Sequence, residues 1–291
     1  MLPITYNEAI QFWTAEESPM KLSAYYELSV VFLEPEPPVT ISGRVLAYGV
    51  NVFTEGAPQI IGSQNFITFK IPTVVETQEL KAQPAQVAVG GTFSLLGTGF
   101  TGSPLDVVIS NALLPKSCIV PLNDPNWKVE LKGSNELSVK VYNTIDLPKE
   151  KPTDPTVSKD ILPGLYAIQI RVSRRFKLPN GTERAVEHLS NQFPFTVTPR
   201  IDTVSPVAVG GKVTITGSVF KNTRLTEKDI QVYVGNDLYT LTSSGAAGTV
   251  DIQNPTTLVV TLLTGLKSKD YLPFRLIILG GESAPNWIQI P

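Results

Sequence analysis

The stretch Val87-Ala88-Val89-Gly90-Gly91-Thr92-Phe93-Ser94-Leu95-Leu96-Gly97-Thr98-Gly99-Phe100 recurs later in the chain as Val207-Ala208-Val209-Gly210-Gly211-Lys212-Val213-Thr214-Ile215-Thr216-Gly217-Ser218-Val219-Phe220. The two stretches align without a gap and both begin with the same Val-Ala-Val-Gly-Gly run. Self-similarity of this kind is typical of a duplicated module. We therefore expect two structural units of the same type in the second part of the chain.

Each copy of the repeat predicts a Gly-Gly turn, an alternating strand and a glycine where the chain must bend. Further short strands are predicted after the first copy at 105–109, 136–141, 166–172 and 193–197, and after the second at 230–234, 257–263, 274–279 and 287–290. Short strands at this spacing, without intervening helices, indicate antiparallel β-sandwiches. We predict one sandwich over 74–199 and a second over 200–291, with the junction near Pro199-Arg200-Ile201.

The first part of the chain, 1–73, predicts a small unit of one helix and a few strands. Thr5 and Glu8 have the spacing of a helix capping box, and Pro19 limits how far that helix runs. An alternating strand is expected at 22–32, with further strands at 39–53 and 66–71. So few elements bury little apolar surface, and we expect this unit to depend on contact with a partner for its stability.

Composition excludes several classes of function. The formal net charge of −2 gives no reason to expect a nucleic-acid partner. Cys118 is the only cysteine, so an intrachain disulfide is excluded. The N-terminus lacks the basic and apolar regions of a signal peptide, and the apolar runs are too short to span a bilayer. We expect folding in the cytoplasm, as part of a particle that is cytoplasmic, membrane-anchored or released; contact with a membrane or envelope is left open.

The sequence offers no assembled catalytic, cofactor or metal site, and we predict that the chain is not an enzyme. His188 is the single histidine, so no histidine cluster can hold a metal. Cys118 beside Ile119 and Val120 is expected to be buried, and His188 to be exposed in a loop or at a strand end. The basic residues at 171, 174, 175 and 177 are expected to form a solvated strand edge that discourages pairing rather than an RNA surface. The proline-rich stretch 147–156 predicts a surface loop.

The repeats resemble the IPT/TIG family of immunoglobulin-like domains. The resemblance is carried by Pro206–Phe220 (PVAVGGKVTITGSVF), Pro163–Val172 (PGLYAIQIRV) and Phe195–Pro199 (FTVTP). It implies a mainly β fold, in which the small N-terminal unit is followed by two tandem Ig-like (IPT/TIG) β-sandwiches. Because such domains occur in adhesins, enzymes and structural assemblies, the resemblance says little about function.

The N-terminal segment resembles the cap, or tail-terminator, proteins of phage-tail-like contractile injection systems. The resemblance is carried by Ala9-Ile10-Gln11-Phe12-Trp13 and by Leu22-Ser23-Ala24-Tyr25-Tyr26-Glu27-Leu28-Ser29-Val30-Val31-Phe32-Leu33, and the helical first half of that family's domain has no counterpart here. It implies a sixfold ring of this chain that closes the end of the sheath and inner tube, with the sandwiches outermost. The residues expected at the subunit contact are Trp13, Tyr25, Tyr26 and Glu27, although the aromatic ones could equally fill a small core.

Two other functions stay open. The main alternative is a cell-surface or carbohydrate-binding adhesin module, in which Trp127 and Trp287 could stack on sugars, although strand-end core positions are the simpler interpretation. The other is a non-catalytic accessory domain of a larger enzyme. The adhesin predicts a secretion signal and many repeats, whereas this sequence contains two repeats and no recognisable signal.

Overall fold

The computed structural model describes residues 57–101, 104–177, 181–267 and 270–291. The described part is built almost entirely of β-strands, with one 3-10 turn, η1 (Glu227–Asp229). These strands enclose two separate hydrophobic cores, one in each copy of the repeat. The predicted mainly β fold with two Ig-like sandwiches is therefore confirmed, while the predicted N-terminal helix lies outside the described residues.

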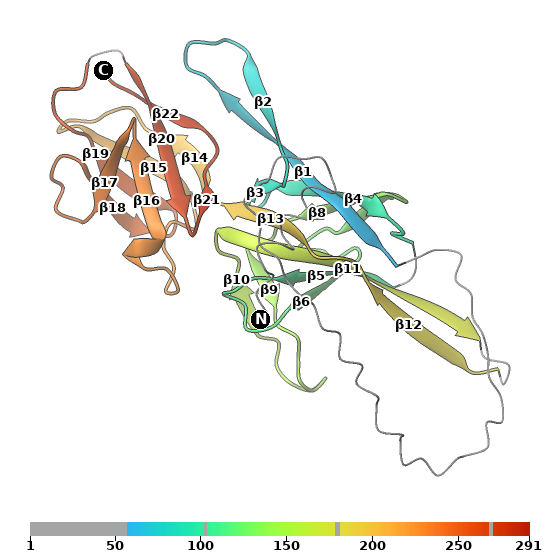
Figure 1. Ribbon diagram of the computed structural model, residues 1–291. Coiled ribbons are helices and arrows are strands. Elements are labelled where there is room, and N and C mark those ends of the chain that lie inside the picture. The colour runs from blue at the N-terminus through green and yellow to red at the C-terminus, as the bar shows by residue number, and fades with distance from the viewer. Residues whose placement is uncertain (1–56, 102–103, 178–180, 268–269) are drawn as a thin grey trace, which may run out of the picture. The chain divides into compact units, whose positions relative to one another are not determined.

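The first sandwich packs two sheets face to face (Figure 1). One sheet has the strand order β2-β1-β4-β8-β7, and the other has the order β3-β13-β11-β5-β6 with β12 added to β11. A separate pair, β9 and β10, flanks the loop at 147–157. The strands are β1 (Gln59–Lys70), β2 (Thr77–Ala82), β3 (Gln86–Ala88), β4 (Thr92–Thr98), β5 (Leu105–Ser110), β6 (Cys118–Pro121), β7 (Glu130–Gly133), β8 (Glu136–Lys140), β9 (Thr144–Asp146), β10 (Ser158–Asp160), β11 (Gly164–Lys177), β12 (Glu183–Leu189) and β13 (Phe193–Thr198).

The second sandwich is one continuous sheet folded around its core. Its order is β14-β15-β19-β18-β17-β16-β20-β21, with β22 also paired to β20. The sheet turns at β17, which pairs parallel with β18 and antiparallel with β16. The strands are β14 (Arg200–Val204), β15 (Lys212–Ser218), β16 (Ile230–Val234), β17 (Asp237–Leu241), β18 (Thr249–Asn254), β19 (Thr257–Thr261), β20 (Tyr271–Ile278), β21 (Gly281–Glu282) and β22 (Asn286–Gln289).

The core of the first sandwich is built on aromatic side chains from both sheets. Phe93 on β4 stacks on Phe195 on β13, with ring centroids 4.8 Å apart, and Tyr166 on β11 lies 5.4 Å from the same ring. The Tyr166 hydroxyl donates a hydrogen bond to the Leu162 carbonyl at 2.8 Å and accepts one from the Leu162 N–H at 3.2 Å. A buried tyrosine bonded to backbone a few residues upstream is also found in the tyrosine corner of Ig sandwiches.

The duplication extends one strand further back than the repeat in the sequence. Gly97 on β4 lies so close to the Gln59 carbonyl of β1 and to the Phe100 ring that a Cβ would collide with both. Gly217 on β15 has the same relationship with the Arg200 carbonyl of β14 and with the Phe220 ring. In both copies the strand paired with this glycine contains a β-bulge, which lies between Ile60 and Gly62 in β1 and between Ile201 and Thr203 in β14. Strand β14 is therefore the counterpart of the first part of β1.

The strands predicted within the described residues are present with shifted ends, whereas those predicted at 22–32 and 39–53 lie outside these residues. Strand β1 has partners that the sequence did not indicate. Residues 59–64 of β1 pair with β4, and 65–70 pair with β2. Residues 59–70 were predicted to belong to the N-terminal unit, yet they share a sheet with the first sandwich. The reason is that sheet membership depends on pairing with a strand far along the chain, which alternation within 66–71 does not reveal.

Candidate functional site

The four residues predicted at a subunit contact, Trp13, Tyr25, Tyr26 and Glu27, lie outside the described residues. The structure therefore leaves that interface as a prediction. The surfaces described below belong to residues 57–101, 104–177, 181–267 and 270–291.

Cys118 and His188 lie on different strands of the first sandwich. Cys118 is fully buried on β6, as expected, and burial together with the nearby Asp146 carboxylate raises the pKa of its thiol to about 11. His188 was expected in an exposed loop or at a strand end, but it lies half-buried within β12, where it pairs with Val172 of β11. The prediction failed because no strand was predicted at 183–189. In strand β12 the side chains alternate, so His188 is half-buried while its neighbour Glu187 is exposed.

The basic residues Arg171, Arg174, Arg175 and Lys177 were expected to form a solvated strand edge. All four lie on β11, which is paired with β12 along this whole segment. On its other side β11 pairs with β5 only as far as Val172, so within the described residues the stretch 173–177 has β12 as its one strand neighbour. The predicted strand edge therefore agrees with the positions of Arg174, Arg175 and Lys177, whereas Arg171 lies where β11 is paired on both sides.

The two sandwiches can be compared with each other, because they are copies of one module. In the second sandwich β20 is short and pairs with β21 and β22, whereas in the first its counterpart β11 continues well past its pairing with β5 and β13. Similarly, β14 ends soon after its bulge, whereas β1 continues into a pairing with β2. Two long hairpins are therefore elaborations of the first sandwich (Figure 1). Elaborations of one copy are natural candidates for a function that the other copy lacks.

The β1–β2 hairpin, over residues 65–82, exposes apolar side chains. Phe66 is 57% exposed and Leu80 is 52% exposed, on a ribbon that has only two paired strands. An isolated two-stranded ribbon is marginally stable in water. Because Leu80 pairs with Ile67, Leu80 and Phe66 lie on opposite faces of the ribbon, so each face offers an exposed apolar side chain for a contact. A strand was predicted at 66–71, but neither Phe66 nor Leu80 was predicted to be a functional residue. The signal that distinguishes the two copies is a sequence spacing: Gln59 and Gly97 are much farther apart along the chain than Arg200 and Gly217.

The β11–β12 hairpin, over residues 171–177 and 183–189, is basic. It contains five Lys or Arg residues and two Glu residues. At its base the Arg171 guanidinium bonds to the buried Asp106 carboxylate and lies 3.9 Å from Glu187. Beyond this ion pair the hairpin extends away from the sheets (Figure 1), and a basic, extended ribbon is suited to contact an acidic surface.

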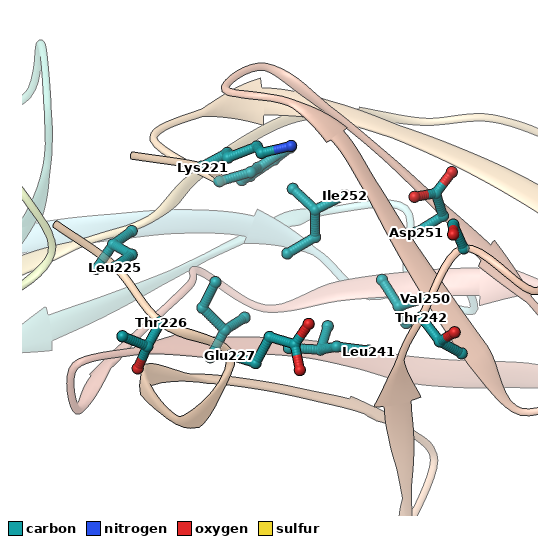
Figure 2. Close-up of a pocket in the computed structure, with 12 residues that line it drawn as sticks. Lys221, Leu225, Thr226, Glu227, Leu241, Thr242, Val250, Asp251 and Ile252 are labelled. Carbon is teal, nitrogen blue, oxygen red and sulfur yellow. The ribbon is translucent and has the colours of Figure 1, made fainter. Parts of the chain in front are cut away.

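The second sandwich has a cleft at its edge instead of long hairpins (Figure 2). This edge cleft has a volume of about 340 Å³. Its inner wall is apolar and its rim is polar and charged, with Lys221, Glu227 and Asp251 among the rim residues. The full lining is Phe220, Lys221, Leu225, Thr226, Glu227, Ile230, Leu241, Thr242, Ser243, Val250, Asp251 and Ile252.

One wall of the edge cleft comes from a connection that is longer in the second copy than in the first. Residues 221–229 join Phe220 to β16, where only residues 101–104 join Phe100 to β5. The longer connection is held by its own hydrogen bonds: the N–H and the hydroxyl of Thr226 both donate to Asp229 Oδ2, at 2.8 and 2.7 Å. These two bonds lower the pKa of the Asp229 carboxyl. The Leu279 N–H also donates to the Asp229 carbonyl at 2.8 Å, which ties the wall to the end of β20.

Neither a metal cluster nor a membrane-spanning helix is found in the part of the chain that the structure describes. Over these ranges, no three His, Cys, Asp or Glu residues are arranged to hold an ion. Within the same residues, no helix is long and apolar enough to cross a membrane.

Comparison with known proteins adds little to the fold. No family model matches the chain, and no curated protein matches it. Among solved structures it is similar to a chimeric titin Z1Z2-Z1Z2 tandem functionalized with a GRGDS exogenous peptide from fibronectin, at 10% sequence identity, over 78% of this chain and 99% of that one, with a TM-score of 0.21. A TM-score this low carries no argument, so the assignment of Ig-like sandwiches rests on the strand order and cores described above.

Proposed function

We propose that this chain is a structural subunit that caps the tube and sheath end of a phage-tail-like contractile injection particle, as a ring of identical copies. The proposal starts from the resemblance of residues 9–13 and 22–33 to cap proteins. Its partners are other copies of the chain, in a ring of six, together with sheath and inner-tube subunits. The chain acts by shape and subunit contacts, without catalysis, cofactor or metal.

The observation that best supports an assembly role is the pair of hairpins on the first sandwich. A ring requires a heterologous contact, in which one surface of a copy meets a different surface of the next. The β1–β2 hairpin offers exposed apolar groups and the β11–β12 hairpin offers basic ones. Ribbons with open edges can also bind a neighbour by strand addition. The hairpins are therefore surfaces through which this subunit would contact its neighbours.

The test is the mass of the full-length protein by light scattering after gel filtration, over a dilution series. We expect a discrete hexamer that persists on dilution. Trp13→Ala should shift this species toward monomer, because aromatic anchors carry a large share of the binding energy at subunit contacts. Phe66→Ser should weaken the same oligomer if the β1–β2 hairpin contributes.

Tyr271→Ala is the matched control, because Tyr271 is a partly exposed aromatic residue of the second sandwich and lies on neither hairpin. It should leave the hexamer unchanged. A protein that stays monomeric at every concentration, and also when mixed with tube and sheath subunits, would contradict the cap role. That result would favour an adhesin-like binding module, which is the alternative left open by the sequence.

A further inference from the structure

The edge cleft of the second sandwich lies beside an open length of sheet edge. Strands β17 and β18 pair in parallel only at Thr240 with Thr249 and at Leu241 with Val250, and the Thr242 N–H donates to the Val250 carbonyl at 2.9 Å. Strand β18 itself continues to Asn254. Within the described residues, the pairing between these two strands therefore ends while β18 still has several residues to run.

The open length of β18 presents main-chain groups toward the cleft. Backbone groups along a strand point alternately to its two sides, and those of Val250 point toward β17. By this alternation, the N–H and C=O of Ile252 point to the same side, past the end of the pairing with β17. A segment of sheet edge with unpaired donors and acceptors is a template for another strand.

The side chains around this edge define what kind of residue the added strand would bring. Ile252 projects into the cleft in Figure 2, with Leu225 of the 221–229 connection on one side and Leu241 of β17 on another. The buried residues Val250 and Phe220 also line the cleft. An aliphatic side chain placed here would leave water for an apolar surface. Ile252 is only half-buried by its own sandwich, so part of its side chain is exposed apolar surface within the cleft.

The rim adds a charge preference. Two carboxylates, Glu227 and Asp251, stand at the cleft with one cation, Lys221, so its balance is negative. Along an extended peptide the neighbours of a buried side chain point the opposite way, toward the rim and solvent. Lys or Arg on either side of the aliphatic residue would therefore meet favourable charge.

We propose that the edge cleft binds an extended peptide segment of a partner protein by strand addition to β18, with an aliphatic side chain in the cleft and flanking Lys or Arg side chains at Glu227 and Asp251. The bonds from Thr226 to Asp229 fix the cleft wall before binding, so less conformational entropy is lost when the peptide docks. The first sandwich has a much shorter connection at this place, so the site belongs to the second copy alone. This site is independent of the ring contacts proposed above.

The test uses the full-length protein with labelled Ile, Leu and Val methyl groups, titrated in NMR with the blocked peptide acetyl-Thr-Lys-Ile-Lys-Thr-amide. We expect saturable shifts of the methyl groups of Leu225, Leu241 and Ile252. Replacing the central Ile of the peptide by Ser should weaken binding about tenfold or more, because an apolar pocket discriminates strongly against a lost aliphatic group. Replacing both Lys residues by Glu should weaken it about fivefold.

Asp251→Lys in the protein should weaken binding of the Lys-containing peptide and improve binding of the Glu-containing one. Glu130→Lys is the matched control, because Glu130 occupies the equivalent position in the first sandwich. Glu130 pairs with Ser138 of β8, which pairs with β4, just as Asp251 pairs with Val259 of β19, which pairs with β15. This control should change neither titration. The proposal is overturned by an absence of saturable shifts, by equal binding of the Ser peptide, or by an equal effect of Glu130→Lys. It is also overturned if acetyl-isoleucine-amide, which lacks an extended backbone, binds as well as the peptide.

Discussion

The Arg171 guanidinium donates two hydrogen bonds to Oδ2 of Asp106, from Nε at 3.0 Å and from Nη2 at 2.5 Å. The two residues face each other on the paired strands β11 and β5. Only 8% of the Asp106 side chain is exposed, whereas 27% of the Arg171 side chain is. A carboxylate removed from water requires a charged, hydrogen-bonding partner, and this pair lies where the β11–β12 hairpin leaves the sandwich.

Arg171→Met should destabilise the protein by about 3 kcal/mol, because it leaves the Asp106 carboxylate buried without its cation. The free energy of unfolding from urea titration, followed by tryptophan fluorescence, measures this loss. The double variant Arg171→Met/Asp106→Leu should regain most of the lost stability, because it removes the buried charge as well. If the double variant is as unstable as the single one, the buried charge is not the cause.

Gly217→Ala should destabilise the second sandwich by about 1–3 kcal/mol. A Cβ at this position would collide with the Arg200 carbonyl and the Phe220 ring, so β14 and the core would have to shift. Gly133→Ala is the control, because no atom lies within 4 Å of the position that its Cβ would take. Urea unfolding of both variants should separate them clearly, and equal stability would contradict the close approach.

A structural feature could be predicted from the sequence where the residues that cause it lie close together along the chain. Gly97 and Gly217 stand at the same place in a repeated strand, and the bend predicted there corresponds to a close backbone contact. The alternation in 66–71 likewise predicted a strand. Both signals act within a few residues: the strand was confirmed, whereas the glycines lie within strands and mark a close approach to the neighbouring strand rather than a bend.

The candidate sites could not be predicted in the same way, because their causes are non-local. The hairpin partner of β11 is β12, and the polar sequence around His188 hides a strand that forms only through this pairing. The edge cleft depends on where the pairing of β17 with β18 stops and on the fold of residues 221–229. Pairing register and loop geometry are decided by tertiary contacts, so a single sequence leaves them open.

Cys118 should be unreactive toward a thiol reagent such as dithionitrobenzoate at pH 8 in the native protein. The thiol is fully buried and its pKa is raised to about 11, so little thiolate forms and the reagent cannot reach it. Labelling should appear only when the first sandwich opens, and its rate should rise with urea. Because Cys118 is the only cysteine, the signal reports on this sandwich alone. Rapid labelling without denaturant would contradict the burial of β6.

Tyr166→Phe should lower the stability at neutral pH by about 1–2 kcal/mol, because the Leu162 N–H and C=O lose the hydroxyl to which both are bonded. The same variant should change the alkaline limb of the stability profile. Burial raises the pKa of Tyr166 from 10.0 to about 12, so above pH 10 the unfolded chain releases this proton before the folded protein does. Stability that is fully present below pH 10 is therefore lost progressively as the pH rises toward 12.

Between pH 10 and 12, the free energy of unfolding of Tyr166→Phe should fall by about 2 kcal/mol less than that of the wild type, because the variant has no phenol to ionise. The measurement is the free energy of unfolding in urea at pH 8, 10 and 11.5. Cys118 contributes a loss of the same sign between pH 9 and 11 and is present in both proteins, so it cancels in the comparison. Parallel profiles for the two proteins would mean that Tyr166 ionises equally in both states, and hence that its hydroxyl is not held in the core.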